Sequence, residues 1–204
     1  MNPNRKLPLI LLVLNLPWWV WSYLGPLDRF TWYLEIAPAA AGIAILILTY
    51  RRFPLTDMTY VLIYLHSLIF LAGGHYTYAR VPLFNWIRDA FELSRNHFDR
   101  LGHFMQGFVP AVIGRELFLR KGVFARKGWL PFFTISVCLA ISAFYELIEW
   151  WTAVGTGAAA NDFLGTQGDV WDSQWDMFMA GIGAACAFIF LSRLHDRFLE
   201  KMKQ

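Results

Sequence analysis

Six apolar stretches, most of them close to 20 residues long, constrain the fold of this chain more than any other feature. About 20 consecutive apolar residues form a helix long enough to cross the hydrocarbon core of a bilayer. Together the stretches take up most of the 204 residues. The sequence therefore predicts an all-α, polytopic membrane protein. We expect a single six-helix domain over residues 1–204, with spans at about 7–24, 31–50, 58–74, 98–118, 129–150 and 173–194.

The composition agrees with a bilayer environment. Charged residues make up 16% of the chain and hydrophobic residues 57%, whereas a soluble domain is about 25% charged. No cysteine metal motif and no nucleic-acid-binding pattern appears, so we expect no nucleic-acid partner. The sequence leaves the oligomeric state open.

The distribution of basic residues predicts how the chain is oriented. Lysine and arginine collect in cytoplasmic segments of membrane proteins. If the N-terminus is inside, 13 of the 18 basic residues lie on the inner side, and 11 of the 15 acidic residues lie on the outer side. Both termini are therefore expected in the cytoplasm.

Two outer segments and one helix contact are also predicted. Residues 77–97 contain an amphipathic helix expected to lie along the outer interface, with Arg95 on its polar side. Residues 152–167 are rich in glycine and alanine and are expected to form a lid. Small residues such as Gly181 and Ala185 favour close packing of the last two spans.

Ionisable side chains gather where four spans reach the outer side. Such groups are costly at membrane depth and usually face a protein interior or a wet cavity. Side chains three or four residues apart share one face of a helix. We therefore expect polar stripes that meet in one pocket. The stripes are formed by Asp99 with His103, by Glu146 with Glu149, and by Asp169 with Asp172 and Asp176.

The charge of such a pocket predicts a cation. Two carboxylates about 4 Å apart repel by about 4 kcal/mol at an effective dielectric constant near 20, and Arg100 is the obvious local cation in the sequence. Carboxylates with an imidazole suit a divalent Zn, Mn, Fe or Mg ion. We predict Asp99, His103, Glu146 and Asp176 as metal ligands, Glu149 and Asp172 as catalytic residues, and His75, Arg100, Gln106, Tyr145, Gln167 and Asp169 as substrate-binding residues.

Each of these residues also has a simpler interpretation. Asp99, Asp169 and Asp172 lie where helices begin, and acids there commonly cap the helix or interact with its dipole. The acids can equally share protons in a relay. Glu35, near the outer end of the second span, is left out of the predicted site, and Glu116 is expected to make a local pair at the inner end.

Four sequence blocks resemble a known family. They are residues 73–79 (GGHYTYA), 98–104 (FDRLGHF), 145–151 (YELIEWW) and 163–172 (FLGTQGDVWD). In combination they resemble the YjdF-like family of bacterial inner-membrane proteins and, more remotely, the VanZ-like membrane proteins. The resemblance implies a bacterial inner-membrane location and the six-span plan. It supplies no substrate and no catalytic assignment.

Three functions stay open from the sequence. The leading hypothesis is a membrane-embedded, metal-dependent hydrolase or transferase that acts on a lipid or lipid-linked substrate at the outer face of the inner membrane. The first alternative is a proton- or cation-coupled transporter or ion-binding protein, which requires polar residues that continue to the inner face. Span six below Asp176 has no charge as far as Leu191. The second alternative is an accessory membrane protein without chemistry.

Overall fold

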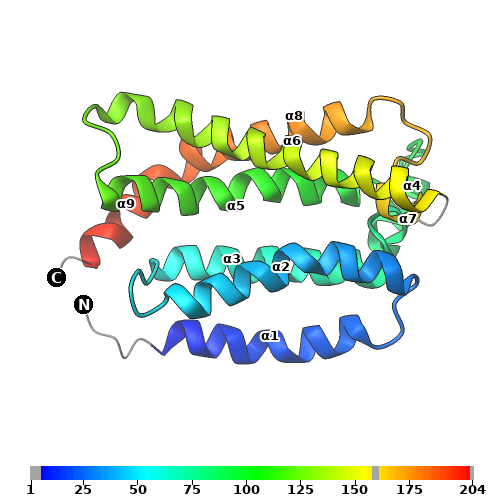
Figure 1. The fold of residues 1–204 in the computed structure, drawn as a ribbon, viewed down its shortest axis with the longest axis horizontal. Coiled ribbons are helices and arrows are strands. Elements are labelled where there is room, and N and C mark those ends of the chain that lie inside the picture. Colours follow the sequence, from blue (N-terminus) through cyan, green and yellow to red (C-terminus); the bar gives the residue numbers. More distant parts are fainter. Residues whose placement is uncertain (1–5, 158–160, 203–204) are drawn as a thin grey trace.

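The computed structural model describes residues 6–157 and 161–202, and over these residues the regular structure is helical throughout. The long helices form two layers that run side by side (Figure 1). Helices α1 (Leu7–Tyr23), α2 (Arg29–Thr49) and α3 (Asp57–Tyr76) form one layer. Helices α5 (Phe98–Lys121), α6 (Leu130–Thr156) and α8 (Asp172–Cys186) form the other.

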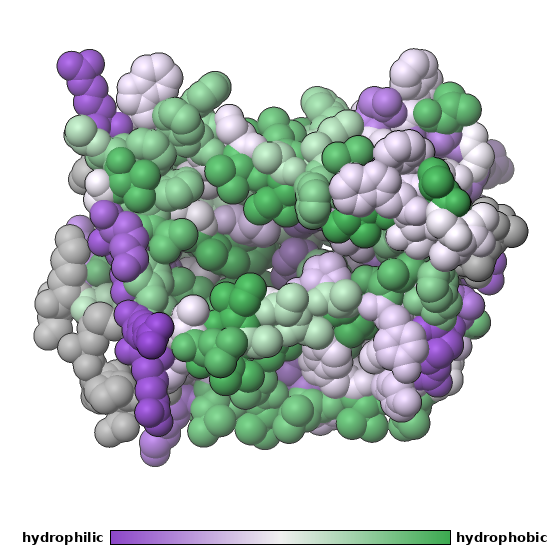
Figure 2. All heavy atoms as spheres, viewed as in Figure 1, coloured by the Kyte–Doolittle hydropathy of each residue, from purple (hydrophilic) through white to green (hydrophobic). Residues whose placement is uncertain are grey.

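Within the described part of the chain, four helices are long and apolar enough to cross a membrane. They are α2, α3, α6 and the continuous 30-residue helix of residues 172–201, in which α8, a π-helical turn η4 (Ala187–Leu191) and α9 (Ser192–Lys201) follow one another. Helix α1 is apolar but has 17 residues, and α5 has charged residues near both ends. Figure 2 shows a broad hydrophobic band between two ends where hydrophilic residues gather. All six predicted stretches are helical.

Local sequence signals explain where the helices begin and end. The Asp28 side chain accepts a hydrogen bond from the Thr31 backbone N–H at 2.6 Å, which caps the start of α2. Thr56 caps α3 in the same way through the N–H of Thr59. Helix α5 ends at Gly122, whose φ of +64° is a left-handed conformation that glycine adopts without strain.

Glycines bring α5 and α8 into backbone contact. A Cβ atom on Gly107 would overlap the backbone of Ala180, and one on Gly183 would overlap the backbone of Phe104. The predicted contact between the last two spans is also present, because a Cβ on Gly181 of α8 would lie 3.2 Å from the Leu139 side chain of α6. The closest approach of α8, however, is to α5.

The outer segments differ from the prediction. Short helices η1 (Tyr78–Arg80), α4 (Pro82–Ala90) and α7 (Asn161–Leu164) lie at one end of the bundle (Figure 1). The amphipathic helix is shorter than predicted because the chain turns at Glu92, which has a φ of +51°, and Arg95 is buried rather than facing solvent. Helix α6 continues through Thr156, so the first part of the predicted lid is helical, and residues 158–160 lie outside the described residues.

The opposite end of the bundle is closed by a buried polar network. Glu116 has no exposed surface and accepts hydrogen bonds from the Thr56 backbone at 2.9 Å and the Thr59 hydroxyl at 2.8 Å. The oxygen that accepts from the Thr56 backbone also contacts Arg120 at 2.8 Å, and Nε2 of the buried His195 of α9 lies 3.2 Å from the oxygen that accepts from Thr59. The network therefore joins α3, α5 and α9, which is more than the local pair predicted for Glu116. The turn η2 (Lys127–Trp129) connects α5 to α6 at this end.

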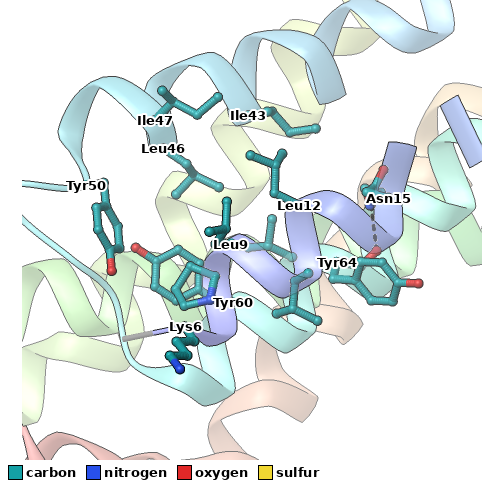
Figure 3. Close-up of a pocket in the computed structure, with 14 residues that line it drawn as sticks. Lys6, Leu9, Leu12, Asn15, Ile43, Leu46, Ile47, Tyr50, Tyr60 and Tyr64 are labelled. Atoms are coloured by element: carbon teal, nitrogen blue, oxygen red, sulfur yellow. Dashed lines mark hydrogen bonds between the residues drawn. The ribbon is translucent and has the colours of Figure 1, made fainter. Parts of the chain in front are cut away.

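An apolar cavity of about 650 Å³ lies between α1, α2 and α3, near the same end (Figure 3). Leucine and isoleucine side chains of α1 and α2 line much of it. At its deep end the Asn15 amide donates to the Ser67 hydroxyl. The cavity is separate from the acidic residues described next, none of which lines it.

Candidate functional site

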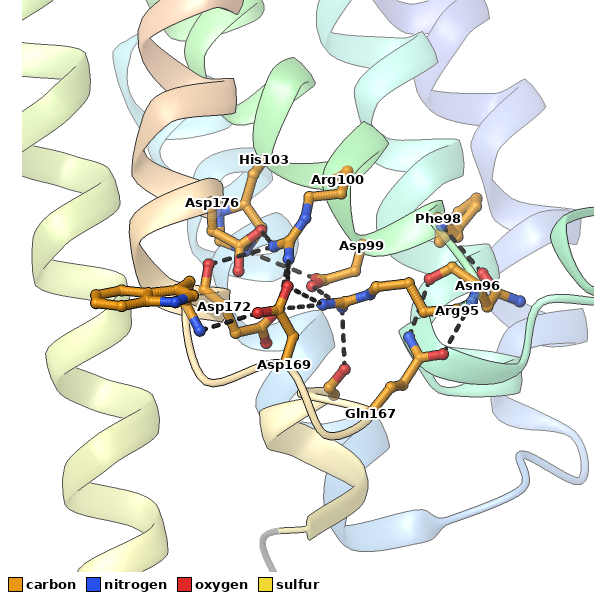
Figure 4. A network of polar contacts seen from close by, with 12 residues as sticks. Arg95, Asn96, Phe98, Asp99, Arg100, His103, Gln167, Asp169, Asp172 and Asp176 are labelled. Atoms are coloured by element: carbon orange, nitrogen blue, oxygen red, sulfur yellow. Dashed lines mark hydrogen bonds and ion pairs between the residues drawn. The ribbon is translucent and has the colours of Figure 1, made fainter. Parts of the chain in front are cut away.

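Acidic and basic side chains from separate elements meet at the end of the bundle that carries α4 and α7. Asp99, Arg100 and His103 come from the first turns of α5, and Asp172 and Asp176 from the first turns of α8 (Figure 4). Glu146 and Glu149 come from α6, while Asp169 lies in the turn before α8. The close packing of α5 on α8 sets the spacing between these side chains.

Two arginines bind the carboxylates at the start of α8 (Figure 4). The Arg100 guanidinium contacts Asp169 at 3.0 Å and Asp172 at 2.8 Å, and its other terminal nitrogen contacts Asp176. Arg95 contacts Asp172 at 2.5 Å, and Asp99 and Asp169 at 3.4 Å each. Buried ion pairs with several hydrogen bonds to each charge avoid an uncompensated charge. Arg95 therefore belongs to the cluster, together with Arg100.

The turn of residues 165–171, which precedes α8, is held next to these ion pairs by hydrogen bonds. Gln167 accepts a hydrogen bond from the Asn96 backbone N–H and donates to the Asn96 carbonyl oxygen, both at 2.9 Å. Arg95 donates to the Gly165 carbonyl oxygen at 3.2 Å. The Trp171 backbone N–H donates to Asp169 at 2.9 Å, and this bond, with the two nearby arginines, lowers the pKa of Asp169. Asp169 is thus held as a carboxylate at neutral pH.

His103 has one nitrogen fixed and one directed at acids. Its Nδ1 lies 2.9 Å from the Gln106 side-chain oxygen, so the proton on Nδ1 donates to Gln106. Its Nε2 lies 3.7 Å from Asp99, 3.7 Å from Glu146 and 3.9 Å from Asp176. These distances exceed those of hydrogen bonds. Nε2 therefore faces three carboxylates without bonding directly to any of them.

Glu146 has an unsatisfied oxygen in this space. Its Oε1, which is the atom nearest to His103, is buried and has no hydrogen-bond partner among the residues that the structure describes. A buried acceptor without a partner costs about 1–3 kcal/mol. Donor atoms of Asp99, His103 and Asp176 lie within 4.8 Å of one another, and those of His103, Glu146 and Glu149 do so as well. Such groups have the spacing required to hold a metal ion.

Tyr78 connects the loop after α3 to the site. Its ring lies against two glycines, because a Cβ atom on Gly73 would overlap the ring and one on Gly102 would lie 2.6 Å from it. The ring also packs on Phe98, with centroids 5.4 Å apart. The glycines of the GGHY and DRLGH blocks therefore let η1 pack against the first turns of α5.

The structure brings most of the predicted site residues together, but not all. Asp99, Arg100, His103, Gln106, Tyr145, Glu146, Glu149, Asp169, Asp172 and Asp176 lie in or against the cluster, with Gln167 at its rim. His75 instead stacks on Trp21 of α1, with centroids 4.3 Å apart, and its Nδ1 lies 3.2 Å from the Ser22 carbonyl oxygen.

Two cluster residues were missed from the sequence. Arg95 lies in the turn before α5, outside any helical repeat, and its contacts with Asp99, Asp169 and Asp172 place it in the cluster. Glu35 of α2 is 4% exposed, and the Tyr145 hydroxyl donates to it at 3.4 Å. Glu35 stands alone on its helix, so only the packing of α2 against the rest of the bundle shows that it belongs here.

Comparisons with known proteins agree with the membrane architecture. A family model described as "Predicted membrane protein (DUF2238)" matches residues 7–197. The chain is similar to "Inner membrane protein YjdF" of Escherichia coli (strain K12), with 49% identity over 175 residues, which cover 85% of this chain and 83% of that protein. No solved structure matches the chain.

Proposed function

The chain belongs to the DUF2238 family of predicted membrane proteins, and on that premise we propose that it is a metal-dependent enzyme of the inner membrane. Its substrate would be a lipid or a lipid-linked molecule at the outer face, and its reaction a hydrolysis or a group transfer. The relative that it resembles is named an inner membrane protein. The observation that carries the proposal is the arrangement of carboxylates around Nε2 of His103.

The proposed topology is one domain with six spans and both termini in the cytoplasm. Helices α1 and α5 would be the two further spans, in addition to the four long apolar helices. The acidic cluster lies at the end of the bundle that carries α4 and α7, and that end is opposite to α9 (Figure 1). The excess of basic residues at the α9 end favours the cytoplasm for that end, because positive charge is retained inside. The cluster would then lie near the periplasmic surface.

The residues present fit a divalent metal ion. An unprotonated Nε2 repels the carboxylates that surround it unless a cation lies between them. Atoms that each bind one ion at about 2.0–2.2 Å are further from one another than the two atoms of a hydrogen bond. The distances of 3.7–3.9 Å from Nε2 to the carboxylates agree with that spacing. Gln106 accepts a proton from Nδ1, as partners of metal-binding histidines do, so that Nε2 is the nitrogen that would bind the ion. Asp99, His103, Glu146 and Asp176 would be the ligands. One imidazole with carboxylates suits Zn, Mn, Fe or Mg.

Such an ion would supply Lewis-acid activation of water or of a phosphoryl or carbonyl oxygen. Among the catalytic candidates, Asp172 accepts hydrogen bonds from both Arg95 and Arg100. Glu149 makes no ion pair with a residue that the structure describes. Glu149 is therefore the better general base, and Arg95 and Arg100 position the carboxylates of α8.

Exposed tryptophans support access from the membrane. Trp150, Trp151, Trp171 and Trp175 lie at the same end as the cluster and are each about half exposed or more. Tryptophan is enriched at the boundary between lipid and water. A lipid head group at this depth would lie level with the carboxylates, which favours a lipid substrate over a soluble one.

Metal content and lipid turnover test the proposal together. We expect protein purified without chelator to contain a divalent metal and to change one lipid class in an Escherichia coli lipid extract, followed by mass spectrometry. EDTA and Glu146→Gln should each remove the change, while Gln174→Ala, an exposed variant of α8, should retain it. Metal-free protein with full activity after chelation would contradict the metal mechanism. If cells that carry the protein with alanine at every cluster position behave like cells with the wild-type protein, while cells that lack the protein do not, the accessory function is favoured.

A further inference from the structure

The apolar cavity between α1, α2 and α3 extends along the bundle from the end opposite to the acidic cluster (Figure 3). Lys6 lines it at that end, just before α1, and Asn15 lines it further along the same helix. The two residues stand nine positions apart, which is about 14 Å along a helix. The hydrocarbon core of a bilayer is about 30 Å thick. The cavity therefore has about the depth of one leaflet.

The walls of the cavity suit a hydrocarbon chain. A cavity with apolar walls stays dry, and it binds apolar molecules. Its volume of about 650 Å³ lies within the range of sites for small ligands, about 300–1,000 Å³. Leu9 of α1 and Ile47 of α2 line the cavity, and they are 64% and 58% exposed. The cavity is therefore reached from the outside of the bundle, where the chains of membrane lipids lie.

The mouth of the cavity is basic. Lys6 lines the mouth, and the exposed Arg51 and Arg52 directly follow Tyr50, another lining residue. Within residues 6–157 and 161–202, none of these three cations makes an ion pair. Asp57 is the acid that begins α3 at the same end, so positive charge is in excess on this part of α1–α3. Basic pockets between spans on the cytoplasmic side are typical sites for anionic head groups.

A hydrocarbon chain alone does not explain a specific site. A lipid chain that moves from the bilayer into an apolar cavity stays in apolar surroundings, so burial contributes little and packing and polar contacts must hold it. The deep end of the cavity is closed by the Asn15 amide, which donates to the Ser67 hydroxyl. The polar contact available to a lipid at the mouth is the charge of Lys6 and the two arginines.

We propose that the cavity binds an anionic phospholipid of the inner leaflet, with one acyl chain between α1 and α2 and the phosphate next to Lys6. The orientation proposed above puts this mouth on the cytoplasmic side. The site is separate from the acidic cluster, so the inference does not depend on a metal or on catalysis. A lipid in this place would fill the space between α1 and the rest of its layer.

Native mass spectrometry of the full-length protein in detergent tests the head group. The probes are phosphatidylglycerol and phosphatidylethanolamine with identical acyl chains. We expect one phosphatidylglycerol per chain to bind more tightly than phosphatidylethanolamine. Lys6→Ala should weaken phosphatidylglycerol binding about fivefold, which corresponds to the loss of one basic residue beside an anionic lipid. Arg126→Ala, an exposed position at the same end but between α5 and α6, should leave the affinity unchanged.

Photolabelling tests the place of the acyl chain. Phosphatidylglycerol with a diazirine at the end of one chain should label lining residues of α1–α3, mapped by peptide mass spectrometry. Leu46→Trp places a large side chain in the cavity and should remove both the label and the tighter binding. Leu48→Trp is the matched control, because Leu48 lies on the same helix, is 78% exposed and does not line the cavity.

The outcomes separate the parts of the proposal. Equal affinities for the two lipids, or an unchanged affinity in Lys6→Ala, overturn the anionic head group. Label that is spread over all the lipid-facing helices, or that persists in folded Leu46→Trp, overturns the cavity as the chain site. A free fatty acid that displaces phosphatidylglycerol at equal concentration overturns the phospholipid as the occupant. If circular dichroism shows that Leu46→Trp does not fold, the Lys6→Ala affinity and the wild-type labelling pattern still decide. Metal content is unaffected in every case.

Discussion

The two ring nitrogens of His103 have different surroundings, and this difference determines what the residue can do. Gln106 accepts the Nδ1 proton at 2.9 Å, one turn further along α5. Nε2 is directed at carboxylates of three different helices. With Nε2 unprotonated the ring can bind a cation there, whereas a proton on Nε2 would be donated to one of the acids.

Gln106→Ala tests the role of the tautomer. Without its acceptor, the ring can turn or change tautomer, and loss of such a partner typically lowers metal affinity 10–100-fold. We expect that range in the dissociation constant for Zn²⁺ or Mn²⁺, measured by competition with a chromophoric chelator. Gln174→Ala on the exposed face of α8 is the control. Equal affinities in wild type and Gln106→Ala would show that Gln106 does not orient the ring.

Asp169 gives the site a pH dependence. Its pKa is lowered below the usual value of 3.8, chiefly by the Trp171 N–H and then by the two arginines. A lowered pKa stabilises the folded state above the unfolded pKa, and this stabilisation is lost as the pH falls through the folded pKa. Asp169→Asn should therefore lower the melting temperature at pH 5–7. The difference from the wild type should shrink below pH 3.8; a difference that grows on acidification would contradict this sign.

At the residue scale, the sequence predicts those site residues that recur on one face of a helix, and it misses site residues that have no such neighbour. Asp99 and His103 share a face because the helix repeat dictates it. Arg95 lies in a turn after the left-handed Glu92, where no repeat applies. Glu35 has no acidic neighbour on α2, so its place in the cluster depends on how α2 packs against α6.

At the scale of the elements, the glycine contact between α5 and α8 sets the geometry of the site. A Cβ on Gly183 would overlap the backbone of Phe104, and Phe104 adjoins His103. The two backbones cannot separate locally without moving the carboxylates of α8 away from His103. The packing and the site are therefore coupled.

Gly183→Val tests this coupling. Overpacking typically costs about 1–3 kcal/mol, and more where backbone must move, so we expect a lower melting temperature and weaker metal binding together. Gly42→Ala on α2, where an added Cβ meets nothing within 4 Å, is the matched control. Normal metal affinity in a folded Gly183→Val protein would show that the site does not depend on this contact.

Element positions were predicted well where apolar runs define them and poorly where they do not. All six stretches coincide with helices to within a few residues, apart from the end of α6. There the chain stays helical to Thr156 although glycine at position 155 favours an earlier end. The last span also continues past residue 194 into α9, because the buried His195 of α9 meets Glu116.

At the scale of the whole molecule, the two polar ends are separated by an apolar core. His103 and Glu116 stand 13 residues apart on α5, which is about 20 Å along a helix. Between these levels the buried residues Ala111, Val112 and Ala184 pack in one cluster. A polar path from one face to the other is not evident in the described residues, which favours a site that opens to one side.

Proteoliposomes test the one-sided site. We expect the reconstituted wild type to carry no proton or cation flux above empty liposomes, with an internal pH dye and radioactive Mn²⁺ as readouts. The apolar core explains this expectation. A flux that disappears in Glu146→Gln but persists in Gln174→Ala would favour the transporter instead.

Labelling tests the proposed orientation. Cysteine introduced as Glu92→Cys lies at an exposed position of the cluster end, and we expect a membrane-impermeant maleimide to label it in intact cells. Arg126→Cys, exposed at the opposite end, should be labelled only after lysis. The reverse pattern would place the cluster in the cytoplasm.

The most direct test of a cation at His103 is an experimental structure with diffraction data collected on both sides of the absorption edge of the metal. Protein purified without chelator and supplied with Mn²⁺ or Zn²⁺ should show an anomalous peak between Nε2 of His103, Oε1 of Glu146 and the Asp176 carboxylate. No peak, with Nε2 hydrogen-bonded directly to one of these acids, would contradict the metal centre.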